Sequence, residues 1–258
     1  MRVAVFLKRV PIPGARIVVT DDGQAVQTAH LGFTMSPHEE CAVEQAVRLV
    51  DQHGGEAVAF TLGPPEAEEQ LRYAVSVGLQ GAVLVPTDGR DVDPQTTAAA
   101  LTAALRAVEA EHGVFDLLLF GNESADSGGY QVGIRVAHAL GRPIVNGAKE
   151  LVVEGDTAVV GRPTGDATER YELPLPAAVG VREGLNLPRY PTFRGRLVSK
   201  KVAVQTHGVM GAVDDAAGQR MLTLVPTAEQ VTETVILGHG PEAAPRVIAV
   251  LEELGVLR

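Results

Sequence analysis

Residues 56–85 read EAVAFTLGPPEAEEQLRYAVSVGLQGAVLV, and this stretch decides the fold class. The apolar run 56–62 predicts a buried strand, which ends at a Gly-Pro-Pro turn. A helix is expected over about residues 66–77, where a glycine stops it, and residues 81–85 predict the next strand. Two buried strands joined by a helix form a unit whose strands pair in parallel.

The same alternation extends outward over about the first 140 residues. Residues 3–7 and 116–120 predict two more apolar strands, and a small hairpin is expected over residues 16–26. SPHE at residues 36–39 begins a helix, because it combines a serine N-cap, a proline in the first turn and a glutamate placed for a capping box. Another helix is expected over about residues 93–111. The sequence therefore predicts an α/β fold with a parallel sheet, whose ligands lie beyond the carboxyl ends of the strands.

The pattern changes after Pro143. Residues 151–163 predict a hairpin with a Gly-Asp turn, and residues 184–201 read as a loop. A strand-like run at residues 221–225 and a helix over about residues 242–254 follow. This C-terminal segment is too small to form a hydrophobic core of its own, so we expect it to pack along the surface of the rest of the chain or of a partner.

Charge and composition exclude several classes of protein. The 258 residues contain 22 Lys and Arg against 32 Asp and Glu, a net charge of −10 that disfavours binding to nucleic acid. The single cysteine, Cys41, cannot form an internal disulfide, which indicates an intracellular protein. Residues 1–10 read as a first strand rather than a signal peptide, and no apolar run is long enough for membrane insertion.

The glycine-rich segment 121–133, GNESADSGGYQVG, follows an apolar strand and precedes a helix over residues up to about 140. Backbone N–H groups at a helix start, next to glycines that permit close approach, suit a phosphate group. An ordinary strand-to-helix turn with capping fits the same pattern. The segment is neither a Walker loop nor GxGxxG, so the pattern alone leaves both interpretations open.

Neither a metal site nor a catalytic group is predicted. Residues 38–41, HEEC, are all of types that bind metal ions. However, consecutive helical residues point about 100° apart and cannot converge on one ion. No Ser–His–Asp or Cys–His arrangement stands out.

A basic segment stands out in this acidic chain. It contains Phe193 among five basic residues, which are Arg189, Arg194, Arg196, Lys200 and Lys201. An apolar side chain among cations is typical of a protein-docking loop, and a solvated loop with a half-buried aromatic ring fits equally well.

In combination, several motifs resemble the β (small) subunit of electron-transfer flavoproteins, and the resemblance runs through nearly the whole chain. They are Lys8-Arg9-Val10, Met35-Ser36-Pro37 with AVEQAVRL after it, Leu62-Gly63-Pro64, the segment 121–133, LPLPA at 173–177 and LNLPRYPT at 185–192. Their occurrence in this order carries the resemblance, since none of them is specific alone.

The resemblance implies a Rossmann-like, three-layer, adenine-nucleotide-binding domain over residues 1–201. It also implies a C-terminal extended arm over residues 202–258, which wraps a partner α subunit. The α subunit holds most of an FAD, and this subunit holds an AMP. The family's nucleotide site falls on Phe6, Ser36, Pro37, His38, Glu39, Leu62, Asn122, Glu123, Ser124, Ala125, Asp126, Ser127, Gly128, Gly129, Tyr130, Gln131, Val132 and Gly133. Several of these contacts are made by the backbone.

The implied function is electron transport. A cytoplasmic heterodimer would carry electrons from flavin dehydrogenases, such as acyl-CoA dehydrogenases, to a downstream acceptor, and this subunit would have no catalytic residues of its own. Within the docking loop 184–201, Phe193 matches the family's apolar anchor, and Arg194, Arg196 and Leu197 follow it.

The chain also departs from the family pattern. Ser36 replaces a common asparagine, Ser-Gly-Gly follows Asp126 where many members continue with aspartates, and Tyr130 or Val132 replaces the usual Asn or Thr of the phosphate turn. AMP is favoured in this subunit. The alternatives are a second FAD, as in electron-bifurcating members, and a stand-alone adenine-nucleotide-binding domain.

Overall fold

A seven-stranded sheet forms the centre of the molecule in the computed structural model, which describes residues 1–258 except 88, 90–91, 209–217, 220, 227–233 and 258. Its strands are β1 (Arg2–Leu7), β4 (Glu56–Gly63), β5 (Gly81–Pro86), β6 (Leu117–Gly121), β7 (Ile144–Ala148), β11 (Ala177–Val181) and β12 (Val204–Thr206). The order across the sheet is β12-β5-β4-β1-β6-β11-β7, and every pair is parallel. The predicted parallel sheet is confirmed.

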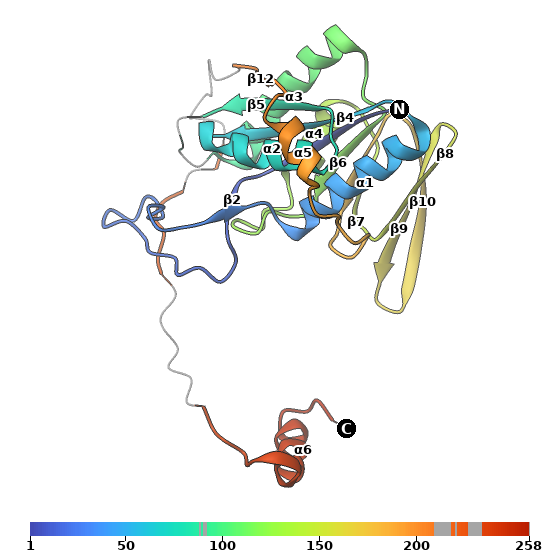
Figure 1. The fold of residues 1–258 in the computed structure, drawn as a ribbon. Coiled ribbons are helices and arrows are strands. Elements are labelled where there is room, and N and C mark those ends of the chain that lie inside the picture. The colour runs from blue at the N-terminus through green and yellow to red at the C-terminus, as the bar shows by residue number, and fades with distance from the viewer. Residues whose placement is uncertain (88, 90–91, 209–217, 220, 227–233, 258) are drawn as a thin grey trace.

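Helices cover both faces of this sheet (Figure 1). On one face lie α1 (Pro37–His53) and α2 (Glu68–Val77), with α5 (Phe193–Ser199) against α2; the other face carries α3 (Pro94–His112) and α4 (Val132–Ala139). A short 3₁₀ turn, η1 (Pro65–Ala67), precedes α2. Successive residues of β1 alternate between the two cores, because side chains of a strand point to opposite faces. The three-layer α/β architecture is therefore confirmed.

A second, antiparallel sheet contains β8 (Glu150–Glu154), β9 (Thr157–Thr164) and β10 (Ala167–Pro174). The predicted hairpin is confirmed, with Gly155 and Asp156 between β8 and β9. Leu151 and Val153 alternate with exposed residues and join the core cluster that includes α1.

The segment after β1 consists mostly of turns and irregular chain. β2 (Val10–Pro11) pairs with β3 (Phe33–Thr34), and the hairpin expected over residues 16–26 is reduced to one bridge between Val19 and Val26. The strand expected at residues 221–225 is not formed either. That stretch instead lies along the same loop, where the Leu224 N–H donates to the Gly23 carbonyl at 2.8 Å.

The C-terminal part begins with β12, which pairs with β5 and extends the central sheet a few residues past residue 201. The division of the chain at that residue stays a prediction. The predicted terminal helix is confirmed as a 3₁₀ turn, η2 (Gly240–Ala243), followed by α6 (Ala244–Glu253). No residue of α6 is buried, and Figure 1 shows the helix apart from the sheet.

Candidate functional site

The strand order places a crevice between the carboxyl ends of β1 and β6. From β1 the chain crosses through α1 to β4 on one side, whereas β6 lies on the other side and leads to α4 on the opposite face. The two outgoing loops therefore diverge at this point, which is where open parallel sheets bind ligands. The segment 121–133 and residues 6–8 both lie at this switch point.

Lys8 and Asp126 join the two loops across the crevice. Lys8 Nζ lies 2.7 Å from Asp126 Oδ2, and both side chains are about one-third exposed. Burial disfavours the carboxylate, but Lys8 together with hydrogen bonds from Ser124 and the Ser127 N–H outweighs burial and holds the pKa of Asp126 below its ordinary value. Asp126 is therefore ionised at neutral pH, and the ion pair fixes the middle of the segment against the end of β1.

The start of α1 forms a third wall. Ser36 caps the helix by accepting from the Glu39 N–H, and the Glu39 carboxylate accepts in return from the Ser36 N–H at 2.7 Å. The other Glu39 oxygen accepts from the Lys8 N–H at 2.7 Å, so this buried side chain ties α1 to β1. The predicted capping box is confirmed. Burial raises the pKa of Glu39 to about 7, against the pull of these hydrogen bonds.

Gly121 permits this close approach of α1 and β6. A Cβ atom on Gly121 would lie 2.6 Å from Glu39 Cγ, so only glycine fits beside the capping box. The glycine at the end of β6 therefore allows the start of α1 and the segment 121–133 to meet.

His38 links three segments at the same edge. Its Nδ1 accepts from the Glu183 N–H at 2.8 Å, and this contact leaves the proton on Nε2 in the neutral ring. Nε2 lies 3.3 Å from Glu123 Oε1 and can donate to it. Residues 38, 123 and 183 are thereby held together, although they come from α1, the glycine-rich segment and the turn after β11.

The glycine-rich segment folds back on itself before α4. Ser124 Oγ lies 2.8 Å from Ser127 Oγ, and the Gly128 N–H donates to the Ser124 carbonyl at 3.0 Å. Gly128 and Tyr130 have φ angles of 53° and 54°, in the left-handed region that strains a non-glycine residue. Gly133 packs against Phe120, whose Cγ would lie 2.9 Å from an added Cβ.

This arrangement fits a nucleotide phosphate at the start of α4. The helix begins without a side-chain cap, so its first-turn N–H groups have no capping acceptor from Gln131. A Cβ atom on Gly128 would meet nothing within 4 Å, so the backbone there is open to a ligand. A phosphate could accept from these amides, while Ser124, Ser127 and Lys8 offer further donors nearby.

The side chains of Phe6 and Leu62 are only partly available for binding a nucleotide. The Phe6 ring is buried and stacked between Phe60 and Phe120, with centroids 5.3 and 4.3 Å away, so its backbone is the part near the crevice. Leu62 is half-buried at the end of β4 and packs against the same core cluster. Thr61, its neighbour, donates to the Leu7 carbonyl at 2.8 Å and links the two strand ends. Binding at these positions stays a prediction.

The docking loop contains a helix, which the sequence reasoning missed. Thr192 Oγ1 accepts from the Gly195 N–H at 2.9 Å and caps α5, so the expectation of a loop throughout 184–201 was wrong. Gly195 lets α5 lie against α2, since an added Cβ would lie 2.1 Å from the Ser76 carbonyl oxygen. A threonine three residues before a glycine is a weak signal, and this short helix has little apolar periodicity.

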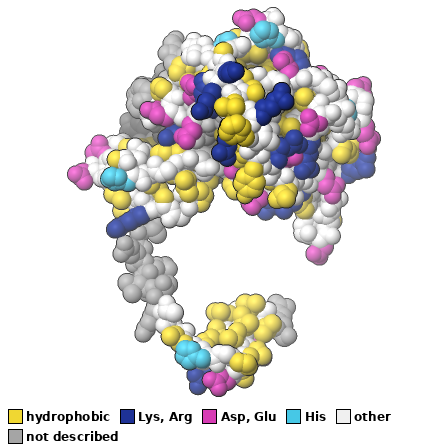
Figure 2. All heavy atoms as spheres, viewed as in Figure 1, with side chains coloured by type: hydrophobic (Ala, Val, Ile, Leu, Met, Phe, Trp, Pro, Cys, Tyr) yellow, Lys and Arg dark blue, Asp and Glu magenta, His cyan; other side chains and the backbone are white. Residues whose placement is uncertain are grey.

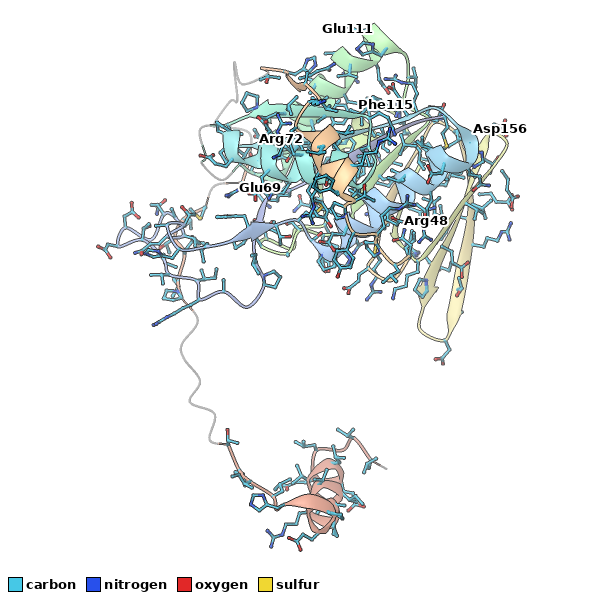
Figure 3. All side chains as sticks on the ribbon, in the orientation of Figure 1. Arg48, Glu69, Arg72, Glu111, Phe115 and Asp156 are labelled. Carbon is cyan, nitrogen blue, oxygen red and sulfur yellow. The ribbon has the colours of Figure 1, made fainter. Side chains whose placement is uncertain are left out.

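The predicted docking residues lie together on α5. Phe193 is 80% exposed and Leu197 is 48% exposed, and Arg194 and Arg196 are exposed beside them. Figure 2 shows hydrophobic side chains bordered by Lys and Arg over α5 and the neighbouring part of α1. An open groove of about 430 Å³ runs between the end of α2 and α5. Arg72, labelled in Figure 3, reaches from α2 to donate to the Ser199 carbonyl.

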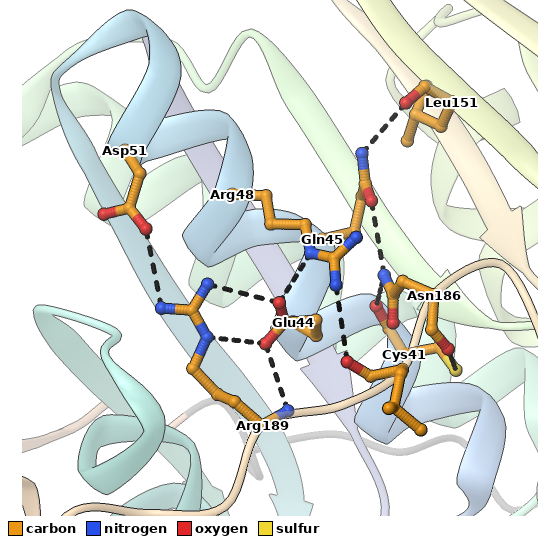
Figure 4. Close-up of polar contacts among 9 residues, drawn as sticks. Cys41, Glu44, Gln45, Arg48, Asp51, Leu151, Asn186 and Arg189 are labelled. Carbon is orange, nitrogen blue, oxygen red and sulfur yellow. Dashed lines mark hydrogen bonds and ion pairs between the residues drawn. The ribbon is translucent and has the colours of Figure 1, made fainter.

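A buried carboxylate in α1 was not anticipated from the sequence. The side chain of Glu44 is only 2% exposed and accepts hydrogen bonds from Arg48 at 2.6 Å and from Arg189 at 2.7 Å (Figure 4). Burial disfavours its charge, but the two arginines outweigh burial and lower the pKa of Glu44. Arg189, which covers Glu44, lies 145 residues further along the chain, so the periodicity of the helix carried no signal of this burial.

Comparison with known proteins agrees with this architecture. The family model described as "Electron transfer flavoprotein domain" matches residues 25–210. The chain belongs to the electron transfer flavoprotein family. Electron transfer flavoprotein subunit beta of Bacillus subtilis is 32% identical over 203 residues, which cover 78% of this chain and 76% of that protein.

Two mycobacterial relatives extend the match. Electron transfer flavoprotein subunit beta of Mycobacterium leprae is 31% identical over 251 residues, covering 92% of this chain and 93% of the relative. The subunit of Mycobacterium tuberculosis strain H37Rv is 30% identical over 224 residues, covering 84% and 83%. These values support an electron-transfer flavoprotein subunit of the β type.

Two further features of the described residues concern membranes and metal ions. None of the described helices is both long and apolar enough to cross a bilayer. In the same part of the chain, no three His, Cys, Asp or Glu side chains gather in a way that could hold a metal ion.

Proposed function

We propose that this chain is the β subunit of a heterodimeric electron-transfer flavoprotein that carries electrons between flavin dehydrogenases and a downstream acceptor. The α subunit holds most of an FAD, and this chain holds an AMP at the crevice between β1 and β6. The observation that carries the proposal is the convergence of the segment 121–133, the start of α1 and Lys8 at that crevice, in a member of this family.

The residues of this chain bind and orient the nucleotide and take no part in a chemical reaction. The N–H groups at the uncapped start of α4 and the serine hydroxyls of the segment 121–133 donate hydrogen bonds to the phosphate, and the Lys8–Asp126 pair holds the loops around it. AMP bound only by the folded state stabilises the subunit by mass action. No side chain acts as a general acid, a general base or a nucleophile, and FAD supplies the electron chemistry when bound.

Docking uses α5. Phe193 enters an apolar pocket of a donor flavin dehydrogenase, such as an acyl-CoA dehydrogenase, and Arg194, Arg196 and Leu197 border that contact. A basic patch on a chain of net charge −10 orients the encounter without requiring tight binding. Residues 202–258, with the exposed apolar side chains of α6, wrap the α subunit in the cytoplasm.

Electron transfer between purified proteins tests this function. The chain is co-expressed with its α subunit and mixed with an acyl-CoA dehydrogenase of the same organism and its substrate. Reduction of the heterodimer's flavin is expected, and Phe193→Ala is expected to raise the KM for the heterodimer about tenfold, as loss of an interface anchor does. No reduction at all, or an unchanged KM in the variant, would contradict the proposal.

A further inference from the structure

Two exposed apolar side chains outside α5 lie close to Phe193 in the sequence. Tyr190 is 90% exposed and Leu187 is 84% exposed, which exceeds even the 80% of Phe193. No other large hydrophobic side chain of the described residues before residue 202 reaches 60%. Three such side chains within seven residues form a concentrated apolar surface, which in soluble proteins marks an interaction site.

The backbone that carries Leu187 and Tyr190 is held to α1. Arg189 donates to buried Glu44 from its backbone N–H at 3.2 Å and from Nε at 2.7 Å. Arg48 donates to the Leu187 carbonyl at 3.4 Å, and the Asn186 amide donates to the Cys41 carbonyl at 3.0 Å (Figure 4). These side chains therefore project from a fixed backbone, and pre-ordering of this kind lowers the entropic cost of binding.

The charges around these side chains indicate what would cover them. Arg48, Arg194 and Arg196 are exposed near the apolar side chains, and Figure 2 shows cations bordering the hydrophobic surface. An apolar centre with a basic border fits a partner face that has an apolar hollow and an acidic rim. The surface is continuous with α5 through Pro191 and Thr192, so one partner can cover both.

We propose that Leu187 and Tyr190 form a second apolar contact, positioned by the Glu44–Arg189 pair, for the same flavin dehydrogenase that α5 docks. The inference rests on the proposed function, and it extends the docking site beyond Phe193, Arg194, Arg196 and Leu197. Glu44 acts as a positioning residue, because its side chain is buried away from the surface and fixes the backbone that carries the contact residues.

The test uses the complete heterodimer and an acyl-CoA dehydrogenase of the same organism. The double variant Leu187→Ala/Tyr190→Ala is compared with Phe193→Ala and with Val114→Ala, a control at an exposed apolar residue outside the docking loop. The double variant is expected to raise the KM for the heterodimer about tenfold, with kcat, flavin content and heterodimer retention on size exclusion unchanged. Val114→Ala leaves the KM unchanged.

Three results would overturn the inference. A raised KM in Phe193→Ala alone would keep the docking function and remove the second contact. Dissociation of the heterodimer in the double variant would assign Leu187 and Tyr190 to the α-subunit interface. An unchanged KM in both variants would remove the second contact together with the proposed docking. Glu44→Gln supplies a positioning readout: a raised KM at unchanged kcat supports the role, and an unchanged KM contradicts it.

Discussion

The carboxylate of Glu44 lies 2.7 Å from Nε of Arg189, which is 145 residues further along the chain. The second Glu44 oxygen accepts from the Arg189 Nη2 atom at 3.2 Å, so the contact is bidentate. Glu44 is buried while Arg189 is partly exposed, and the pair therefore fastens a surface segment to the body of the protein. A bidentate pair of this geometry adds directional specificity as well as attraction.

Loss of this pair should destabilise the protein. Glu44→Gln is expected to lower the free energy of unfolding by about 2 kcal/mol, since hydrogen bonds to charged groups contribute about 1.5–3 kcal/mol. Denaturant unfolding of the heterodimer at pH 7 measures the change. Glu172→Gln is the control, because its pair with Arg170 is exposed and 3.9 Å long, and it should cost under about 0.5 kcal/mol. Equal effects of the two variants would contradict this role for Glu44.

Glu39 should make stability fall as the pH rises through the neutral range. Its pKa is raised from 4.5 to about 7 by burial, so the folded state binds its proton more tightly than the unfolded state does. The stabilising contribution of that proton is complete below pH 4.5 and is lost as the pH rises towards about 7. A shift of this size corresponds to about 3 kcal/mol.

The variant Glu39→Gln isolates this effect, because it removes the titrating group. Unfolding of the wild-type and variant heterodimers is compared at pH 5 and pH 8. Relative to the variant, the wild type should be about 2.5 kcal/mol more stable at pH 5 than at pH 8, because pH 5 already lies above the unfolded-state pKa. If the difference in unfolding free energy between wild type and variant does not change with pH, Glu39 has the same pKa in the folded and unfolded states.

Gly133→Ala should disturb the start of α4. The added methyl group would lie 2.9 Å from Cγ of Phe120, whose ring is stacked on Phe6 and cannot easily move. We expect a loss of about 1–3 kcal/mol in stability and weaker retention of the nucleotide. Gly208→Ala, where an added Cβ meets nothing within 4 Å, is the matched control. Both variants behaving as the wild type would contradict the close packing at Gly133.

Tyr130→Asn should be tolerated or stabilising. Tyr130 has a φ of 54° and is 51% exposed, so its ring gains little from packing while its backbone is strained. Asparagine adopts the left-handed region more readily, and a gain of up to about 1 kcal/mol is expected in thermal or denaturant unfolding. A clear loss of stability would mean that the tyrosine ring makes a contact that outweighs the strain.

Much of the sheet could be predicted from the sequence, because its strands are buried on both faces and read as short apolar runs. The capping box at Ser36 and Glu39 was equally visible, since its residues lie within one helical turn. β7 and β12 were missed: β7 contains Asn146 and Gly147, and β12 has only three residues, so neither gives an apolar run. Their pairing depends on distant strands that supply the partners.

The position of the site in the fold could be predicted from the sequence. The side-chain contacts that hold it together could not. Segments at the ends of β1 and β6 had to lie at the same edge if the sheet was parallel. The observed strand order makes β1 and β6 neighbours, and the Lys8–Asp126 pair joins the two segments. The pairing of Glu44 with Arg189 joins positions too far apart in sequence for periodicity to reveal. The helix α5 was missed because its stability comes from packing against α2 rather than from its own sequence.

The ligand content of the purified heterodimer tests the central claim most directly. The chain is co-expressed with its α subunit, the complex is purified, and its ligands are released with acid and quantified by chromatography. The proposed function predicts one FAD and one AMP for each heterodimer. Two FAD without AMP would assign the crevice between β1 and β6 to a second flavin, and a stable flavin-free monomer that hydrolyses ATP would contradict the proposed function altogether.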